Sequence, residues 1–290
     1  MMDWIREGEA LPPALPGEPD SSRATRPTVV EDEAGDLRMW YAGHDGSTSR
    51  ILGAVQRVGE AWKRIGVVID AGFSGDADHY GVESPCVVRT PGGYLMSYGG
   101  FDGEVTRLHM ATSADGLNWA PQGTIMQREA EDVLAATDPC LLVSGSEVWL
   151  YYTGHSEVAN LPRATIMAAV SPSGASWDRI GPVLEPAPGE VAVSHACVLD
   201  VAATFWMFFG CDDGIRSTIE MATSRDGVTW ERRGTTLSPS GTGPDARSVH
   251  GPCAVRLHDG TLRMWYAGLA AEDQGPSYRI CSARFPAPPF

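Results

Sequence analysis

Two acidic residues, Glu83 and Asp138, stand just before prolines that open apolar runs. Three other ionisable residues, Arg26, His195 and His250, stand just before similar runs elsewhere in the chain. Two carboxyl groups can perform acid–base chemistry when one is protonated and the other is ionised. The same residues could instead form a buried ion-pair network, or hold a metal ion between two imidazoles and two carboxylates. Each of these roles requires a fold that brings distant segments together.

The chain contains a repeat that supplies such a fold. A tryptophan followed four residues later by a glycine occurs five times, at spacings of 58, 57, 58 and 53 residues. Self-similarity at a fixed period is typical of repeat architectures. The five copies begin at Trp4, Trp62, Trp119, Trp177 and Trp230.

Each repeat is predicted to form four short strands. The first follows the proline, as at residues 85–88, because the first position of a strand tolerates a missing N–H. The second is aromatic and ends in glycine, as at 148–154, and its apolar residues on both faces indicate a sheet packed between neighbours. The third carries an aliphatic residue and an alanine, as at 166–169. An Asp-Gly turn such as 115–116 then leads to the tryptophan of the fourth strand.

The two ends of the chain complement each other. The last repeat stops at residue 285 without a fourth strand, while residues 4–8 are an additional copy of one. We therefore expect the N-terminal strand to complete the last blade, which would remove the open edges of a ring. The predicted fold is all-β: a five-bladed β-propeller of four antiparallel strands per blade, with residues 1–290 as one domain.

Composition excludes some classes of partner. The formal net charge is −15 and the sequence pI is about 4.8, which disfavours binding to a nucleic acid backbone. No run of 18 apolar residues is present and the first residues lack a basic region followed by an apolar one. We expect a cytoplasmic protein with no membrane partner.

Four of the six cysteines occupy the same place in successive repeats, directly after the proline or alanine that opens the first strand. We interpret them as small buried residues without a redox or metal role. Cys211 and Cys281 have no counterparts. The four equivalent residues are Cys86, Cys140, Cys197 and Cys253.

The Met-Trp-Tyr-Ala-Gly strands at 39–43 and 264–268, the Ser-x-Asp-Gly-x-x-Trp turns and the fivefold count resemble the furanosidase-type propellers. This superfamily includes the invertase and arabinanase/xylosidase families and the mannoside phosphorylases. The resemblance covers nearly the whole chain. It implies a site at the axial end where the innermost strands begin, and a carbohydrate or sugar-like small molecule as substrate.

The resemblance also implies individual roles. Glu83-Ser84-Pro85 looks like the motif that carries the general acid of those families, and Asp138-Pro139 looks like the motif of their second carboxylate. Glycosidic cleavage uses two carboxyl groups in this way. The chain departs from the hydrolase pattern because Arg26 stands where a first-blade aspartate is usual, and because the glutamate and aspartate occur in the reverse order.

The leading expectation is a glycoside hydrolase-like enzyme with Glu83 and Asp138 as catalytic residues and Arg26, His195 and His250 as substrate-binding residues. A close alternative is a glycoside phosphorylase that binds phosphate with Arg26 and the histidines. A propeller repurposed for a non-hydrolytic, metal-assisted reaction and a non-catalytic sugar-binding module are further alternatives. No cofactor is expected, and the sequence does not indicate an oligomeric state.

Loops near the same axial end supply further candidates. His44, Asp45, Asp102 and His155 follow the glycine that ends a second strand, where they could contact substrate hydroxyls. Tyr80 lies in the segment that leads to Glu83, and lead-in loops often shape pockets. Each of these residues could equally be a solvated turn residue.

Overall fold

The computed structural model describes residues 3–127, 129, 132–158, 161–271 and 277–285. The chain is all-β, as predicted, with one short 3-10 helix, η2 (Gly243–Asp245), among these residues. No described helix is long and apolar enough to cross a membrane.

The strands pair in antiparallel groups of four, one group for each sequence repeat. Group 1 is β2 (Arg23–Glu31), β3 (Leu37–His44), β4 (Ser49–Gln56) and β5 (Lys63–Ile69). Group 2 is β6 (Gly81–Thr90), β7 (Gly93–Phe101), β8 (Thr106–Ser113) and β9 (Ala120–Thr124). Group 3 is β10 (Ala135–Ser144), β11 (Glu147–Val158), β12 (Leu161–Ser171) and β13 (Asp178–Leu184).

Group 4 is β14 (Ala192–Val201), β15 (Thr204–Asp212), β16 (Ser217–Ser224) and β17 (Glu231–Leu237). Group 5 is β18 (Ser248–Arg256), β19 (Leu262–Leu269) and β20 (Tyr278–Phe285), completed by β1 (Ile5–Leu11). The N-terminal strand pairs with β20, as the sequence predicts. Single parallel bridges join groups 1 and 2 and groups 3 and 4, so the strands form one sheet of four and two of eight.

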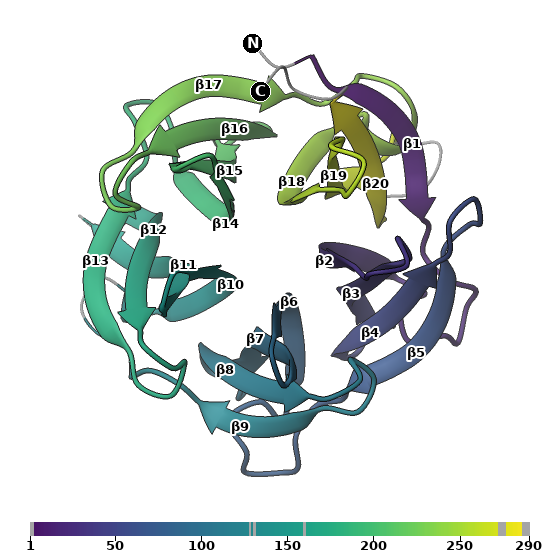
Figure 1. Ribbon diagram of the computed structural model, residues 1–290, viewed down its shortest axis with the longest axis horizontal. Helices are drawn as coiled ribbons and strands as arrows, with labels where there is room; N and C mark the ends of the chain where they lie inside the picture. The colour runs from purple at the N-terminus through teal and green to yellow at the C-terminus, as the bar shows by residue number, and fades with distance from the viewer. Residues whose placement is uncertain (1–2, 128, 130–131, 159–160, 272–276, 286–290) are drawn as a thin grey trace.

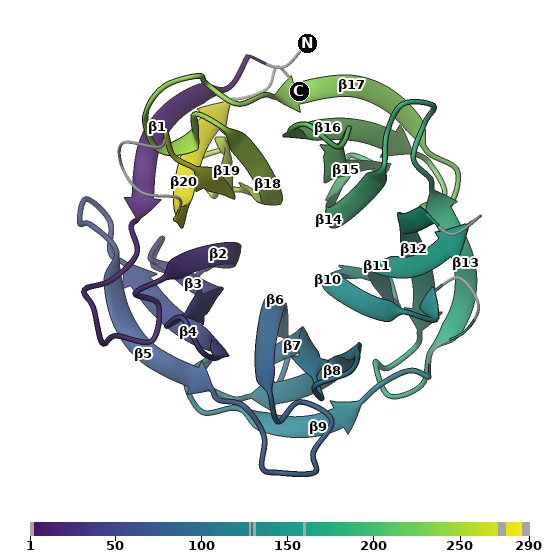
Figure 2. The same cartoon turned by 180° about the vertical axis from the view of Figure 1, so that it is seen from behind.

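The groups surround a common centre (Figure 1). The first strand of each group lies innermost and the strand that contains the repeat's glycine lies at the outer edge, and the reverse view shows the same order (Figure 2). Aromatic side chains pack between neighbouring groups. The Trp119 ring lies 5.9 Å from Trp40 of the preceding group, and Trp230 lies 5.9 Å from Tyr151. Because these strands are apolar on both faces, the core lies between the groups.

Every innermost strand has a β-bulge near its start. The pairing register shifts at the same place in β2, β6, β10, β14 and β18. The residue before the proline or alanine has a positive φ, between 51° and 60°, in all five strands. We call these residues the bulge ring: Arg26, Ser84, Asp138, His195 and Gly251.

A second ring lies two residues further along the same strands. Each member accepts a hydrogen bond from a backbone N–H of the next group, for example Leu141 N to Cys86 Sγ at 3.1 Å and Val29 N to Cys253 Sγ at 3.2 Å. The contacts run from each group to the next and return to the first. The cysteines are free thiols, as predicted, and their sulfur atoms also accept the hydrogen bonds that connect neighbouring groups. We call these residues the thiol ring: Thr28, Cys86, Cys140, Cys197 and Cys253.

Candidate functional site

The bulges place charged side chains at the centre of the molecule. A positive φ is uncommon for residues other than glycine, and strain of this kind clusters at functional sites. Arg26, Asp138 and His195 adopt it, although a glycine occupies the equivalent position in group 5. The predicted set occupies two structural positions, because Glu83 and His250 stand one residue before the bulge residue.

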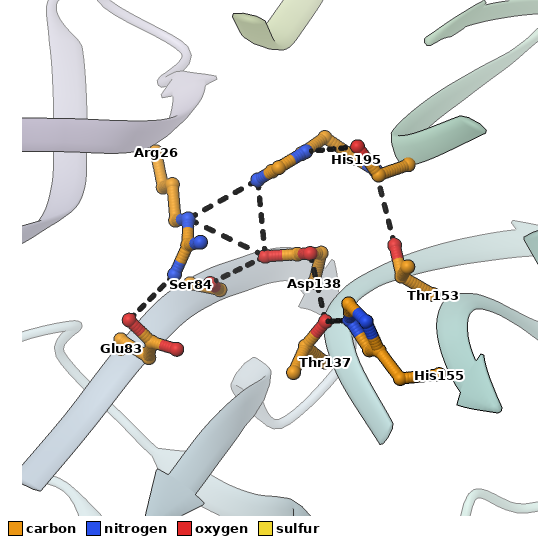
Figure 3. Close-up of polar contacts among 9 residues, drawn as sticks. Arg26, Glu83, Ser84, Thr137, Asp138, Thr153, His155 and His195 are labelled. Atoms are coloured by element: carbon orange, nitrogen blue, oxygen red, sulfur yellow. Dashed lines mark hydrogen bonds and ion pairs between the residues drawn. The ribbon is translucent and has the colours of Figure 1, made fainter. Parts of the chain in front are cut away.

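Arg26 belongs to a polar network with Glu83, Asp138 and His195 (Figure 3). Its guanidinium Nη1 lies 2.5 Å from Glu83 Oε2, and its Nε lies 3.4 Å from Asp138 Oδ1. The same Nε donates to His195 Nε2 at 3.2 Å. The fold thus brings together the predicted Arg26, Glu83, Asp138 and His195 from strands of four different groups.

Asp138 is held as a carboxylate. Its side chain is 5% exposed, and burial alone would raise its pKa. The positive charge of Arg26, together with the hydrogen bond from Ser84, outweighs burial and holds the pKa of Asp138 well below its ordinary value. Ser84 Oγ donates to Oδ1 and Thr137 Oγ1 donates to Oδ2, each at 2.8 Å. An ionised, fully bonded carboxylate suits a base, a nucleophile or a counter-charge better than a proton donor.

The neighbouring imidazoles are neutral at pH 7. Burial lowers the pKa of His195 to about 4, against the attraction of Asp138. Burial also lowers the pKa of His155, whose Nε2 lies 2.8 Å from Thr137 Oγ1. We assign the His195 proton to Nδ1, because this ring atom lies 2.7 Å from Ser194 Oγ while Nε2 accepts from Arg26.

His250 lies beside this network. Its ring centroid is 5.2 Å from that of His195 and 4.8 Å from that of Tyr278. Burial, with the positive charge of Arg26, lowers the pKa of His250 well below its ordinary value. Its buried Nδ1 has no hydrogen-bond partner among the described residues.

Cavities surround Arg26 and Glu83. A small one of about 40 Å³ lies on the axis, lined by the bulge ring and the residues that follow it. A cavity of about 610 Å³ opens between groups 3 and 4 and is lined by Glu83, Asp138 and His155, among others. Two smaller ones, of about 170 and 290 Å³, lie on the other side of Glu83. Glu83 lines the 610, 290 and 170 Å³ cavities, and its side chain is 26% exposed.

The side chains of His44 and Tyr80 line the 290 Å³ cavity together with Arg23, which the sequence analysis did not assign to the site. Arg23 also lines the 170 Å³ cavity with Arg26 and His250. Within the described part of the chain, no carboxylate forms an ion pair with Arg23. Arg23 therefore presents a cationic side chain to both of the smaller cavities.

Asp45 and Asp102 have structural roles in the loops. Asp45 accepts from the backbone N–H groups of Ser47 and Thr48 and pairs with Arg50 at 2.6 Å. Asp102 does the same at the equivalent turn, and neither residue lines the cavities described above. The turn-residue alternative describes these two side chains better than substrate contact does.

An acidic residue, buried in groups 1, 3 and 5 and partly buried in groups 2 and 4, anchors the segment that leads to each innermost strand. Asp20 accepts hydrogen bonds from Tyr41 and Arg64, both at 2.9 Å. The arginine stands two residues before the repeat's glycine, so the outermost strand holds the lead-in segment in place. Sets of the same kind occur in groups 3, 4 and 5: Asp132–Tyr152–Arg179, Glu190–Arg232 and Asp245–Tyr266–Arg6.

Group 2 lacks the arginine of these sets. Pro121 occupies the equivalent position, and Asp78 retains Tyr98 as partner at 3.2 Å. His109 stacks on Tyr98 with ring centroids 5.3 Å apart. The segment that leads to Glu83 and carries Tyr80 is therefore anchored by fewer charged contacts than the segments of groups 1 and 3.

The guanidinium of Arg26 occupies the space where the metal alternative would need an ion between Glu83 and Asp138. Among the described residues, one cluster brings three ligand atoms within 4.8 Å of one another: Glu190, Cys211 and Glu220. Arg232 pairs with both glutamates there, at 2.7 and 3.2 Å. A cation already balances that cluster.

Known proteins share this fold. Two uncharacterized proteins of Mycobacterium tuberculosis are 27% and 26% identical, with 92% of this chain and 95% of each relative covered. No family model matches the chain. A glycoside hydrolase superposes with a TM-score of 0.81 at 16% identity, covering 99% of this chain and 93% of its own. The structure of a complex of BT0996 with RGII gives 0.80 at 16% identity, covering 97% and 92%.

A third structure comes from work on the GH130 family of mannoside phosphorylases, which contains hydrolases that target β-1,2 mannosidic linkages. It superposes with a TM-score of 0.76 at 15% identity, covering 100% of this chain and 95% of its own. The structural neighbours are thus glycoside hydrolases and relatives of phosphorylases, as the resemblance implied. At these identities the likeness establishes the fold alone.

Proposed function

We propose that the chain is a five-bladed β-propeller over residues 1–290, with the strand groups as blades, and that it cleaves a glycoside of a sugar or sugar-like small molecule. The observation that carries this proposal is the network of Glu83, Arg26 and Asp138 where three cavities meet. The glycosidase neighbours support the same class of reaction.

The two carboxylates have different environments and therefore different roles. Glu83 lines the 610, 290 and 170 Å³ cavities and exchanges protons with the glycosidic oxygen or with the attacking water. Asp138 remains ionised and stabilises the positive charge that develops on the sugar in the transition state. Arg26 couples them, since it contacts Glu83 Oε2 and Asp138 Oδ1.

The test is turnover of a panel of aryl furanosides and pyranosides by Glu83→Gln and Asp138→Asn. Both substitutions preserve shape, so we expect an unchanged fold by circular dichroism and a loss of kcat of at least about a hundredfold, the smallest effect typical of acid–base groups. The matched control is Glu147→Gln at the β10–β11 turn, which should keep full activity. Full turnover by both site variants would move the active site elsewhere.

Phosphorolysis is the second candidate, and Arg23 favours it. Arg23, Arg26 and His250 line a cavity of about 170 Å³ that could admit an oxyanion, and Arg23 forms no ion pair with a described carboxylate. Inorganic phosphate bound there could replace water as the nucleophile. Cleavage assayed with and without phosphate separates the two reactions. If phosphate raises the rate, Arg23→Gln should raise the KM for phosphate by a larger factor than it lowers any rate of hydrolysis.

A further inference from the structure

We propose that the 610 Å³ cavity binds an apolar aglycone, so that the substrate is a glycoside of an alkyl or aryl alcohol and not of a second sugar. This inference rests on the proposed glycoside cleavage and specifies its substrate class. The evidence is a comparison of residue types, apolar or polar, at one structural position that all five groups share.

That position is the residue just before each innermost strand. Its backbone N–H donates to the carbonyl of a residue near the end of the group's second strand, at 2.8–3.0 Å in every group. Equivalent backbone bonds place these five residues at the same position in every group, and Tyr80, Leu134 and Val191 line cavities at the site. We call these residues the rim: Ser22, Tyr80, Leu134, Val191 and Arg247.

The rim is apolar in groups 3 and 4 alone. Leu134 is 47% exposed and Val191 is 49% exposed, and both line the 610 Å³ cavity. The other three rim residues are a serine, a tyrosine and an arginine. Two exposed aliphatic side chains at neighbouring equivalent positions form a patch, and exposed apolar patches at a cavity indicate binding.

Apolar residues also line the rest of this cavity, between the rim and the charged network. Ala135, Pro162, Ala164 and Ala192 line it between the rim and Asp138. Its volume lies within the ~300–1,000 Å³ typical of small-molecule sites. Ser156 and Arg163 are the main polar lining residues away from the network. A second sugar would bury several hydroxyl groups against this aliphatic wall, and burial without hydrogen bonds costs free energy.

The cavity on the opposite side of Glu83 has the contrasting character. Its lining includes Arg23, His44, Ser49 and Tyr80, which offer hydrogen bonds to hydroxyls and an aromatic ring to a sugar face. The sugar ring therefore occupies the polar side and the aglycone occupies the apolar side. This orientation places the glycosidic bond beside Glu83, which lines both cavities.

The experiment compares methyl, butyl and hexyl β-mannopyranosides by calorimetric binding to the Asp138→Asn protein and by turnover with the wild-type protein. We expect the affinity to rise with chain length, by at most about fourfold per methylene for complete burial. Leu134→Ser and Val191→Ser should remove most of this gain. Val143→Ser is the matched control, because Val143 is also 47% exposed but lies near the opposite end of β10.

Equal binding of the methyl and hexyl compounds, or a gain that Leu134→Ser and Val191→Ser leave intact, would overturn the inference whether or not turnover is seen. Chain-length-dependent binding with no turnover of any glycoside would instead reject the proposed reaction and keep the apolar subsite. If binding and turnover both increase with chain length, Leu134→Ser and Val191→Ser should each reduce that increase and Val143→Ser should preserve it. This result would support both the apolar subsite and the proposed reaction.

Discussion

Two rings that lie two residues apart on the same strands differ in composition. The thiol ring has nearly the same residue type throughout, with cysteine in four groups and threonine in the fifth. The bulge ring has a different residue in every group. The thiol ring joins each group to the next through equivalent backbone contacts, so its geometry is the same everywhere. The difference indicates that ring closure requires uniform residues, whereas the site requires varied ones.

The largest expected effect comes from breaking the charge balance of the bulge ring. Arg26→Met leaves the buried Asp138 without its main counter-charge, and removing one partner of a buried ion pair costs about 3–5 kcal/mol. We expect a loss of this size in the free energy of unfolding, measured by denaturant titration. The double variant Arg26→Met/Asp138→Asn should recover a large part of it. A double variant as unstable as Arg26→Met would show that Arg26 acts through packing alone.

A second effect of the bulge ring depends on pH. The pKa of His195 is lowered to about 4, whereas an unfolded chain has a histidine pKa of about 6.5. Because the unfolded state binds the proton first, stability falls as the pH drops from about 6.5 to about 4, by up to about 3 kcal/mol. His155 and His250 shift in the same direction, while Asp138 loses its contribution only at lower pH.

His195→Asn should flatten this slope in denaturant titrations at pH 4.5 and 7, because asparagine tolerates a positive φ and does not titrate. His258→Asn is the control, since the His258 side chain is 63% exposed. An unchanged slope for His195→Asn would show that His195 is already protonated in the folded protein.

The smallest effect tests the thiol ring. Cys140→Ala removes the acceptor of Val198 N–H, and an unsatisfied buried donor costs about 1–3 kcal/mol. Cys140→Thr should cost less, because Thr28 Oγ1 already accepts the equivalent bond from Val87 N at 3.2 Å. Denaturant midpoints of the two variants decide the order. If threonine proved worse than alanine, packing and not the hydrogen bond would determine the residue at this ring.

The sequence predicted the all-β class and the N-terminal partner of β20, because strand periodicity and the repeated tryptophan depend on local residues. It also identified Arg26, Glu83, Asp138 and His195, since each stands beside a strand start that recurs. It could not separate the bulge residue from the one before it, because the bulge is a property of strand pairing. Arg23 was not assigned to the site, because its place beside both smaller cavities depends on residues from distant parts of the chain.

Other features were visible in the sequence but not recognised. An arginine stands two residues before the repeat's glycine in four copies, Arg6, Arg64, Arg179 and Arg232. This arginine binds the acidic residue that anchors the lead-in segment, and the sequence alone does not show that contact. Asp45 and Asp102 show a further difficulty for sequence analysis, because each carboxylate near the predicted site accepts hydrogen bonds from its own turn.

The pairing of β1 with β20 also affects how the protein folds. Residues such as Ile5 and Arg284 are direct partners, so one group combines segments that lie far apart in the sequence. Contacts of such long sequence separation slow folding, because a large loop must close before they form. We therefore expect the β1–β20 pairing to form after the local hairpins of the other groups, and the edge of β20 stays unpaired until then.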